Sequence, residues 1–302
     1  MIGTVNSEPS TNLSDSLESC SVPEPAARHE SPQAGRAELN VALVCGQSAT
    51  TSAYATSPLR LLIPRPRGPS VWVYCSNFGG GLVAGDQTRI DLRVERGARC
   101  FTSTQASTKV YKNPDRLPCS HVTQCMVEED ALLVFAPDVM QAFADSSYRQ
   151  HQQWFLAKSA GLVLLDWFGA GRPANGERWA FQRLQSRNDV FVANERVFTD
   201  SVCLDAADET IGSPYRTGRF DCFALLLTVG PQLERFTEDL FQDYSSRPIQ
   251  RRASLVWSVS RIRGGTLLRL AGENTEEVGA ALRQRLQRLS THLGADPWQR
   301  RT

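Results

Sequence analysis

Five carboxylates beside turns and strand ends are the residues of this chain best suited to chemistry. They are Asp86, Asp138, Asp145, Asp166 and Glu177. Carboxylate oxygens bind divalent cations through exchangeable contacts, so several of them along a channel would pass an ion from one to the next. Acids at such positions also cap turns or pair with arginines. Their spacing alone favours this structural role.

A second candidate is a cluster formed by Cys119, His121 and Cys125. On a strand these positions point to one face, so two thiolates and an imidazole would converge on a metal ion. No fourth ligand is evident, and the spacing matches no closed zinc pattern. A metal site is one hypothesis, and a surface histidine between buried thiols is the alternative.

The glycine-rich segment GGGLVAGD at residues 79–86 matches the loose dinucleotide fingerprint GxGxxA. That fingerprint needs a following helix to receive the pyrophosphate. Here residues 88–94 alternate as a strand does, and no Gly-Lys-Ser/Thr follows to form a phosphate loop. We therefore expect a turn with positive φ angles that leads into a strand, with Asp86 as its polar anchor.

The hydroxyl-rich segment FTSTQASTKVY at residues 101–111 contains Thr104 and Lys109. Such a strand either lines a wet groove or passage or simply faces solvent. Nucleophile motifs such as GxSxG do not occur. A β-rich hydrolase that uses Asp138 and Glu177 as acid and base is the alternative hypothesis for function.

Most positioning elements are expected to be strands, because apolar residues recur with a period of two. Ile90, Leu92 and Val94 alternate with polar residues, and many short apolar runs separated by turn residues follow. Such a density of short strands predicts a mainly β body.

Two helices interrupt this pattern. The first begins near Pro231, where apolar residues fall at helical spacing. The second is C-terminal, and Asn274 with Glu277 resembles the capping box that starts a helix. Its apolar stripe comprises Val278, Leu282, Leu286, Leu289 and Leu293. The other face carries Arg283, Arg285 and Arg288, which we expect to be solvated.

Composition bounds the class of protein. The chain has 302 residues and a net charge of +1, which argues against a nucleic-acid partner or an anionic membrane surface. Eight irregularly spaced cysteines, without a secretory signal or a membrane-length apolar run, indicate a cytoplasmic protein with free thiols. Residues 1–37 are rich in Ser, Pro, Glu and Ala, which predicts a disordered tail before one domain at 38–302.

The order of several motifs resembles the UreD (UreH) family of urease accessory proteins. Residues 79–86 resemble the GGLVGGD turn of that family, and TQASTKVY at 104–111 is similar to its TTQGATKVY segment. Further matches are FAPD at 135–138, AFAD at 142–145, and DW followed by GRPANGERW between 166 and 179. Departures are Met140-Gln141 in place of Ile/Val-Pro, the Ser147-Tyr148 variation and the long N-terminal segment.

This resemblance implies a stacked β-sheet, β-helix-like body with two helices and no catalytic activity. It implies a maturation scaffold that binds UreF directly and the GTPase UreG through UreF, with a possible homodimer in the accessory complex. The assembly would dock on apo-urease and deliver nickel, a transported ion and not a permanent cofactor, through a water-filled passage. By position, we expect Asp86, Asp138, Asp145 and Glu177 to contact nickel transiently, with Thr104, Lys109 and Arg172 lining the passage.

Overall fold

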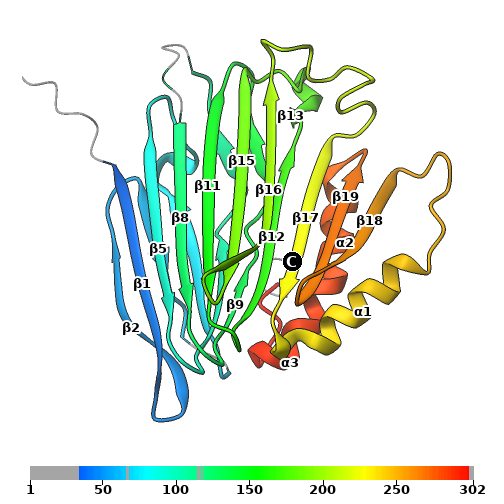
Figure 1. The fold of residues 1–302 in the computed structure, drawn as a ribbon. Coiled ribbons are helices and arrows are strands. Elements are labelled where there is room, and N and C mark those ends of the chain that lie inside the picture. Colours follow the sequence, from blue (N-terminus) through cyan, green and yellow to red (C-terminus); the bar gives the residue numbers. More distant parts are fainter. Residues whose placement is uncertain (1–33, 66–67, 114–116, 118, 299–302) are drawn as a thin grey trace, which may run out of the picture. The chain divides into compact units, whose positions relative to one another are not determined.

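Most of the described chain folds into two β-sheets, called sheet A and sheet B below (Figure 1). The computed structural model describes residues 34–65, 68–113, 117 and 119–298. From one edge to the other, sheet A contains β16 (Glu195–Asp205), β15 (Arg183–Val192), β11 (Ser147–Leu156), β8 (Cys119–Val127), β5 (Gln87–Val94), β1 (Gly35–Val44) and β2 (Gln47–Ala55).

Sheet B is longer and carries a short branch. Its main path is β18 (Leu255–Ile262), β19 (Gly265–Gly272), β17 (Cys222–Val229), β12 (Gly161–Gly169), β9 (Leu132–Phe135), β6 (Arg99–Thr104), β4 (Val71–Asn77) and β3 (Leu59–Leu62). The branch is β10 (Met140–Ala142), which pairs with β12 and with β7 (Thr108–Val110). A separate two-stranded ladder joins β13 (Gly171–Arg172) to β14 (Glu177–Arg178).

The chain winds between the sheets from β4 to β12. It visits sheet B, then sheet A, in the order β4, β5, β6, β8, β9, β11 and β12, and strands that become neighbours within one sheet are parallel. This is a β-solenoid-like stacked arrangement, and the structure contains 51% strand and 15% helix. The predicted fold class is confirmed.

Helices cover the outer face of sheet B. They are α1 (Glu234–Ser245), α2 (Thr275–Leu286) and α3 (Ser290–Leu293), with 3-10 turns η1 (Phe78–Gly80), η2 (Pro173–Asn175), η3 (Pro231–Leu233) and η4 (Gln287–Leu289). The predicted apolar stripe of the C-terminal helix is buried against outward-facing residues of β12 and β19. None of the helices in the described ranges is long and apolar enough to cross a membrane.

The cap of α2 is confirmed in part. The Glu277 backbone N–H donates to the Asn274 side-chain oxygen at 2.7 Å. The Glu277 carboxylate instead accepts a hydrogen bond from Ser254 at 2.7 Å, which ties the helix to the segment before β18. The helix start therefore has one half of a capping box and one tertiary contact.

The prediction of a solvated arginine face on α2 is wrong for Arg285. Its residue exposure is only 3%, and its guanidinium pairs with Asp243 of α1 and lies 5.1 Å from the centroid of the Tyr244 ring. Docking of α1 beside α2 covers this position, which helical spacing within α2 alone does not reveal. Arg283 and Arg288 are exposed, as predicted.

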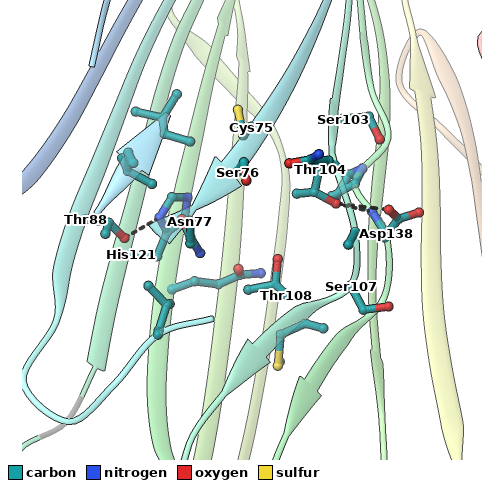
Figure 2. A pocket seen from close by; sticks show the side chains of 18 of the residues that line it. Cys75, Ser76, Asn77, Thr88, Ser103, Thr104, Ser107, Thr108, His121 and Asp138 are labelled. Carbon is teal, nitrogen blue, oxygen red and sulfur yellow. Dashed lines mark hydrogen bonds between the residues drawn. The ribbon is translucent and has the colours of Figure 1, made fainter. Parts of the chain in front are cut away.

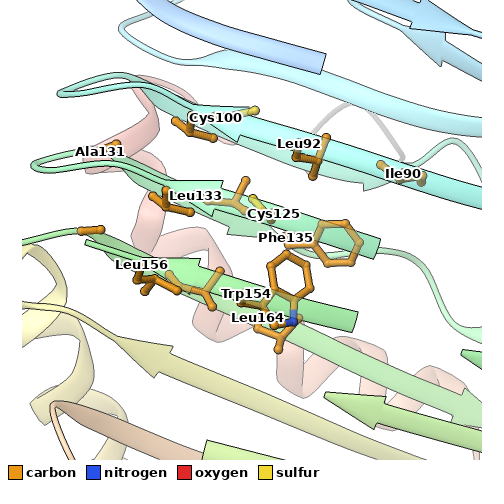
Figure 3. Packing of buried hydrophobic residues seen from close by; sticks show 14 of the residues in the cluster. Ile90, Leu92, Cys100, Cys125, Ala131, Leu133, Phe135, Trp154, Leu156 and Leu164 are labelled. Atoms are coloured by element: carbon orange, nitrogen blue, oxygen red, sulfur yellow. The ribbon is translucent and has the colours of Figure 1, made fainter. Parts of the chain in front are cut away.

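Apolar side chains from both sheets fill one end of the space between them. Leu92 and Cys125 of sheet A meet Leu133 and Leu164 of sheet B in this core (Figure 3). The Phe135 and Trp154 rings cross the gap with centroids 4.8 Å apart. A smaller apolar cluster fills the other end, around Leu82, Tyr148, Trp179 and Leu184.

The predicted tail at residues 1–37 lies mostly outside the described residues. Strand β1 begins at Gly35, three residues before the predicted start of the domain. Ala37 is fully buried and is in register with Ala55 of β2 and Ile90 of β5. Pairing on both sides explains why this small residue belongs to the sheet.

Candidate functional site

A cavity of about 210 Å³ lies between the two sheets, beside the larger apolar core. Its walls include Thr88, His121, Gln150 and Gln152 of sheet A and Cys75, Phe135 and Asp166 of sheet B. The end of β6, the segment between β6 and β7, the start of β7 and the chain entering β10 complete it (Figure 2). They contribute Ser103, Thr104, Gln105, Ala106, Ser107, Thr108, Asp138 and Met140. Most of these side chains carry a hydroxyl, amide, imidazole or carboxyl group, and apolar side chains such as Leu59, Leu82, Ile90 and Trp167 form much of the remaining wall. The cavity therefore combines polar groups that can bind water or a small polar solute with a largely apolar surface.

The glycine-rich turn forms part of this wall through Gly80 and Leu82. Gly79, Gly80 and Gly85 have φ angles of 77°, 75° and 82°, which glycine adopts without strain. The Asp86 carboxylate accepts a hydrogen bond from the Val83 backbone N–H at 2.9 Å, directly before β5 begins. The prediction of a turn into a strand, anchored by Asp86, is confirmed.

The hydroxyl-rich segment lines the cavity where β6 ends and β7 begins. Between the two strands, the chain leaves the sheet ladder at residues 105–107. The Asp138 backbone N–H donates to the Thr104 hydroxyl at 2.8 Å, which joins this break to the loop before β10 (Figure 2). Of the two interpretations of residues 101–111, the structure supports a wall of a polar interior space.

His121 faces the cavity from β8. Its ring nitrogens are hydrogen-bonded to the hydroxyls of Thr88 at 2.8 Å and Thr123 at 3.0 Å. Burial lowers the pKa of His121 to about 4. The imidazole is therefore neutral at physiological pH and adds no positive charge that would repel a cation.

Cys119, His121 and Cys125 do not form a metal cluster. The Cys119 thiol donates to the Val83 carbonyl at 2.6 Å, whereas Cys125 belongs to the apolar core at the other end. Burial raises the pKa of both thiols, that of Cys119 to about 11. Within the described residues, no three His, Cys, Asp or Glu side chains are placed to hold a metal ion together.

The Asp166 carboxylate lies between the two sheets. It extends from β12 of sheet B and accepts hydrogen bonds from three residues of sheet A: Gln150 at 3.0 Å, Ser186 at 2.6 Å and Asn188 at 2.8 Å. Burial raises its pKa, and these three donors partly offset that rise. Because Asp166 also lines the cavity, it offers an oxygen ligand at the inner end of a polar space.

Asp166 belongs to a band of polar side chains that separates the two apolar clusters, called the polar layer below. In sheet A the band follows positions that are in register on adjacent strands. Its members are Thr88, His121, Thr123, Gln150, Gln152, Ser186, Asn188 and Asp200 of sheet A and Asp166 and Arg269 of sheet B. A polar level through the interior costs stability unless its groups bond to one another or to water.

Sequence reasoning named Asp166 but missed its partners Gln150, Ser186 and Asn188. Polar residues in a strand commonly face solvent, so their residue types alone did not mark these three as interior. The alternation of residues along β11 could have revealed the interior position of its glutamines. Gln150 and Gln152 share a face with the buried Trp154 and Leu156. In a period-two strand, residues at i and i+2 point to the same side.

Two of the residues predicted to form the passage, Thr104 and Asp138, line the cavity. Asp86 caps the glycine-rich turn, and Lys109 is exposed on β7, outside the cavity lining. The remaining three, Asp145, Arg172 and Glu177, lie around the β13–β14 ladder, also outside the lining.

Ion pairs hold Asp145, Arg172 and Glu177 in place. The Arg172 Nε donates to Glu177 at 2.9 Å and lowers the pKa of that carboxyl group. Lys112 lies 3.4 Å from Asp145. The structure therefore divides the predicted acids among the interior cavity, the glycine-rich turn and a surface cluster. The proposed hydrolase pair is divided in the same way, because Asp138 lines the cavity and Glu177 does not.

Comparisons with known proteins identify the family of this chain. The family model described as "UreD urease accessory protein" matches residues 33–302. A protein of Sorangium cellulosum named urease accessory protein UreD is 42% identical over 270 residues, which cover 89% of this chain and 85% of that protein. Urease accessory protein D of Oryza sativa subsp. japonica is 31% identical over 296 residues, covering 88% of this chain and 95% of that protein. The chain belongs to the UreD family of urease accessory proteins.

Proposed function

We propose that this chain is a urease maturation chaperone that helps to deliver nickel into apo-urease. Membership of a family of urease accessory proteins supports the general role. The observation that carries the nickel role is the polar cavity, which brings Asp138 and Asp166 into one interior space with hydroxyl and amide groups.

The ligand chemistry of the cavity suits a transported ion. Carboxylate, hydroxyl and amide oxygens give weaker and more exchangeable contacts to Ni²⁺ than clustered thiolates and imidazoles do. A closed site with three strong ligands would retain the ion and slow its release. Nickel is therefore the cargo of this chain, and Asp138 and Asp166 are its interior contacts. Asp86, Asp145 and Glu177 are candidates for contacts before or after the cavity.

The proposed partners follow from the family role. The chain would act as a non-catalytic scaffold in the cytoplasm that contacts UreF directly, UreG through UreF, and apo-urease as the acceptor, and it would form a homodimer within that complex. Apolar side chains exposed at the surface, such as Tyr54, Phe78 and Tyr215, are suited to contacts of this kind.

Co-expression tests this proposal. Apo-urease is expressed with UreF, UreG and the remaining accessory proteins, either with or without this chain, at limiting nickel. We expect urease activity and urease-bound nickel to depend on the chain, and tagged chain to retain UreF and UreG. Full activation without the chain would overturn the proposal.

A further inference from the structure

The polar layer continues beyond the cavity toward β16, the edge strand of sheet A, and β19, which lies beside β18, the edge strand of sheet B. Gln150, Gln152 and Asp166 are the last members of the layer on the cavity wall. Beyond them lie Ser186 and Asn188, which are 3% and 0% exposed. Asn188 accepts a hydrogen bond from Gln152 at 3.0 Å, so the contacts are continuous from the cavity to β15.

At that edge the polar layer ends in an ion pair between the two sheets. Asp200 of β16 is in register with Asn188 of β15. The Arg269 guanidinium of β19 donates to the Asp200 carboxylate at 2.7 Å. The side-chain exposures are 15% for Asp200 and 48% for Arg269, so the carboxylate is the inner partner and the guanidinium the outer one.

Asp166 and Arg269 lie at the same level of sheet B. Both are in register with Leu225, which stands between them on β17. Burial is the main cause of the raised pKa of Asp166, and the charge of Asp200 adds to it. Each carboxylate therefore lies within the electrostatic reach of the other, and a divalent cation between them would relieve their repulsion.

We propose that the Asp200–Arg269 ion pair closes a second opening of the interior passage. A divalent cation that has reached Asp166 passes this point when it replaces the Arg269 guanidinium as the counter-ion of Asp200. The guanidinium is free to turn into solvent because nearly half of it is already exposed. This inference rests on the proposed function, in which nickel crosses the interior.

A neighbouring ion pair provides a matched control. Arg263 pairs with Glu195 at 2.5 Å and also connects β16 to the β18–β19 hairpin. Its side chains are 70% and 63% exposed, and neither residue belongs to the polar layer. Loss of this pair removes a similar link between the sheets without changing the proposed opening.

The test measures the initial rate of urease activation at limiting nickel, with purified accessory complex that contains each variant of the chain. We expect Asp200→Asn to lower the rate about tenfold, because it removes the receiving carboxylate, and Asp200→Glu to restore it. Arg269→Gln removes the competing cation and should leave the rate at or above that of the wild type. Glu195→Gln and Arg263→Gln should match the wild type.

Different activation rates for the Asp200 and Arg269 variants would distinguish an opening from a purely structural contact. If Asp200→Asn and Arg269→Gln lower the rate equally, or if both match the control variants, the inference is overturned. Thr108→Trp, which places an indole in the cavity wall, separates this failure from that of the proposed function. If Thr108→Trp lowers the rate while Asp200→Asn and Arg269→Gln match the control variants, only the second opening is overturned. If urease is fully activated without the chain, both proposals are overturned.

Discussion

The Asp166 carboxylate on β12 accepts a hydrogen bond of 2.6 Å from the Ser186 hydroxyl on β15. This contact joins the two sheets within the polar layer. A carboxylate between two sheets needs hydrogen-bond donors to replace water, and sheet A supplies three. The same group links the two sheets and is, in the proposed function, an interior contact for nickel.

Asp166→Asn should destabilise the chain by about 1–3 kcal/mol. The asparagine NH2 group would face the three donors of sheet A, and one of those donors would lose its acceptor. Urea unfolding at neutral pH measures this change in the free energy of unfolding. Asp208→Asn, at an exposed position in a loop, is the matched control and should be neutral. Equal midpoints for the two variants would show that the three hydrogen bonds do not hold the sheets together.

His121 should make stability depend on pH. Its pKa is about 4 in the folded chain against 6.5 for a free side chain. Between these values the unfolded chain binds a proton that the folded chain does not. The contribution of His121 is therefore intact above pH 6.5, is lost as pH falls toward 4, and then stays constant, with a total of about 1–3 kcal/mol.

The variant His121→Gln isolates this effect because glutamine does not titrate. The unfolding free energies of wild type and variant are compared at pH 7 and at pH 4.5, where carboxylate titrations common to both cancel. We expect the wild type to lose more stability than the variant. Parallel losses would mean that His121 is protonated in the folded chain.

Secondary structure was largely predictable from local pattern, and the interior was not. The spacing of Leu282 and Leu286 predicts a buried helix face, and the spacing of Ile90 and Leu92 predicts a strand. Arg285 and Gln152 are buried because a second element covers them, and no local pattern in one strand or helix reveals that element. Asp138 was predicted from its place beside a turn, but its position on the cavity wall depends on the pairing of β10 with β7 and β12.

Leu286→Asp should destabilise the chain by about 4 kcal/mol or more, since it removes a buried side chain and places an unpaired charge in its site. Leu286 is 1% exposed in the cluster between α2 and sheet B. Thermal or urea unfolding measures the loss, and Gln284→Asp on the exposed face of the same helix controls for the added charge. Wild-type stability of Leu286→Asp would contradict the docking of α2.

Asp243→Ala should cost about 3–5 kcal/mol, because it leaves the Arg285 guanidinium buried without a counter-charge. Arg285→Met, which fills the site with an apolar side chain, should cost less. The exposed pair of Arg261 and Glu238 offers the comparison, and Glu238→Ala should cost much less than Asp243→Ala because solvent screens that pair. If Asp243→Ala were no more destabilising than Glu238→Ala, the buried charge would have another partner.

Obstruction of the cavity tests the central claim most directly. Thr108→Trp narrows the space between the sheets, whereas Ser201→Trp adds the same side chain at an exposed position of β16. Urease-bound nickel is measured after activation by complexes that contain each variant and that retain UreF and UreG equally. An interior route predicts that Thr108→Trp lowers nickel incorporation at least about tenfold while Ser201→Trp matches the wild type. Equal incorporation by the two variants, with an intact complex, would contradict passage of nickel through this cavity.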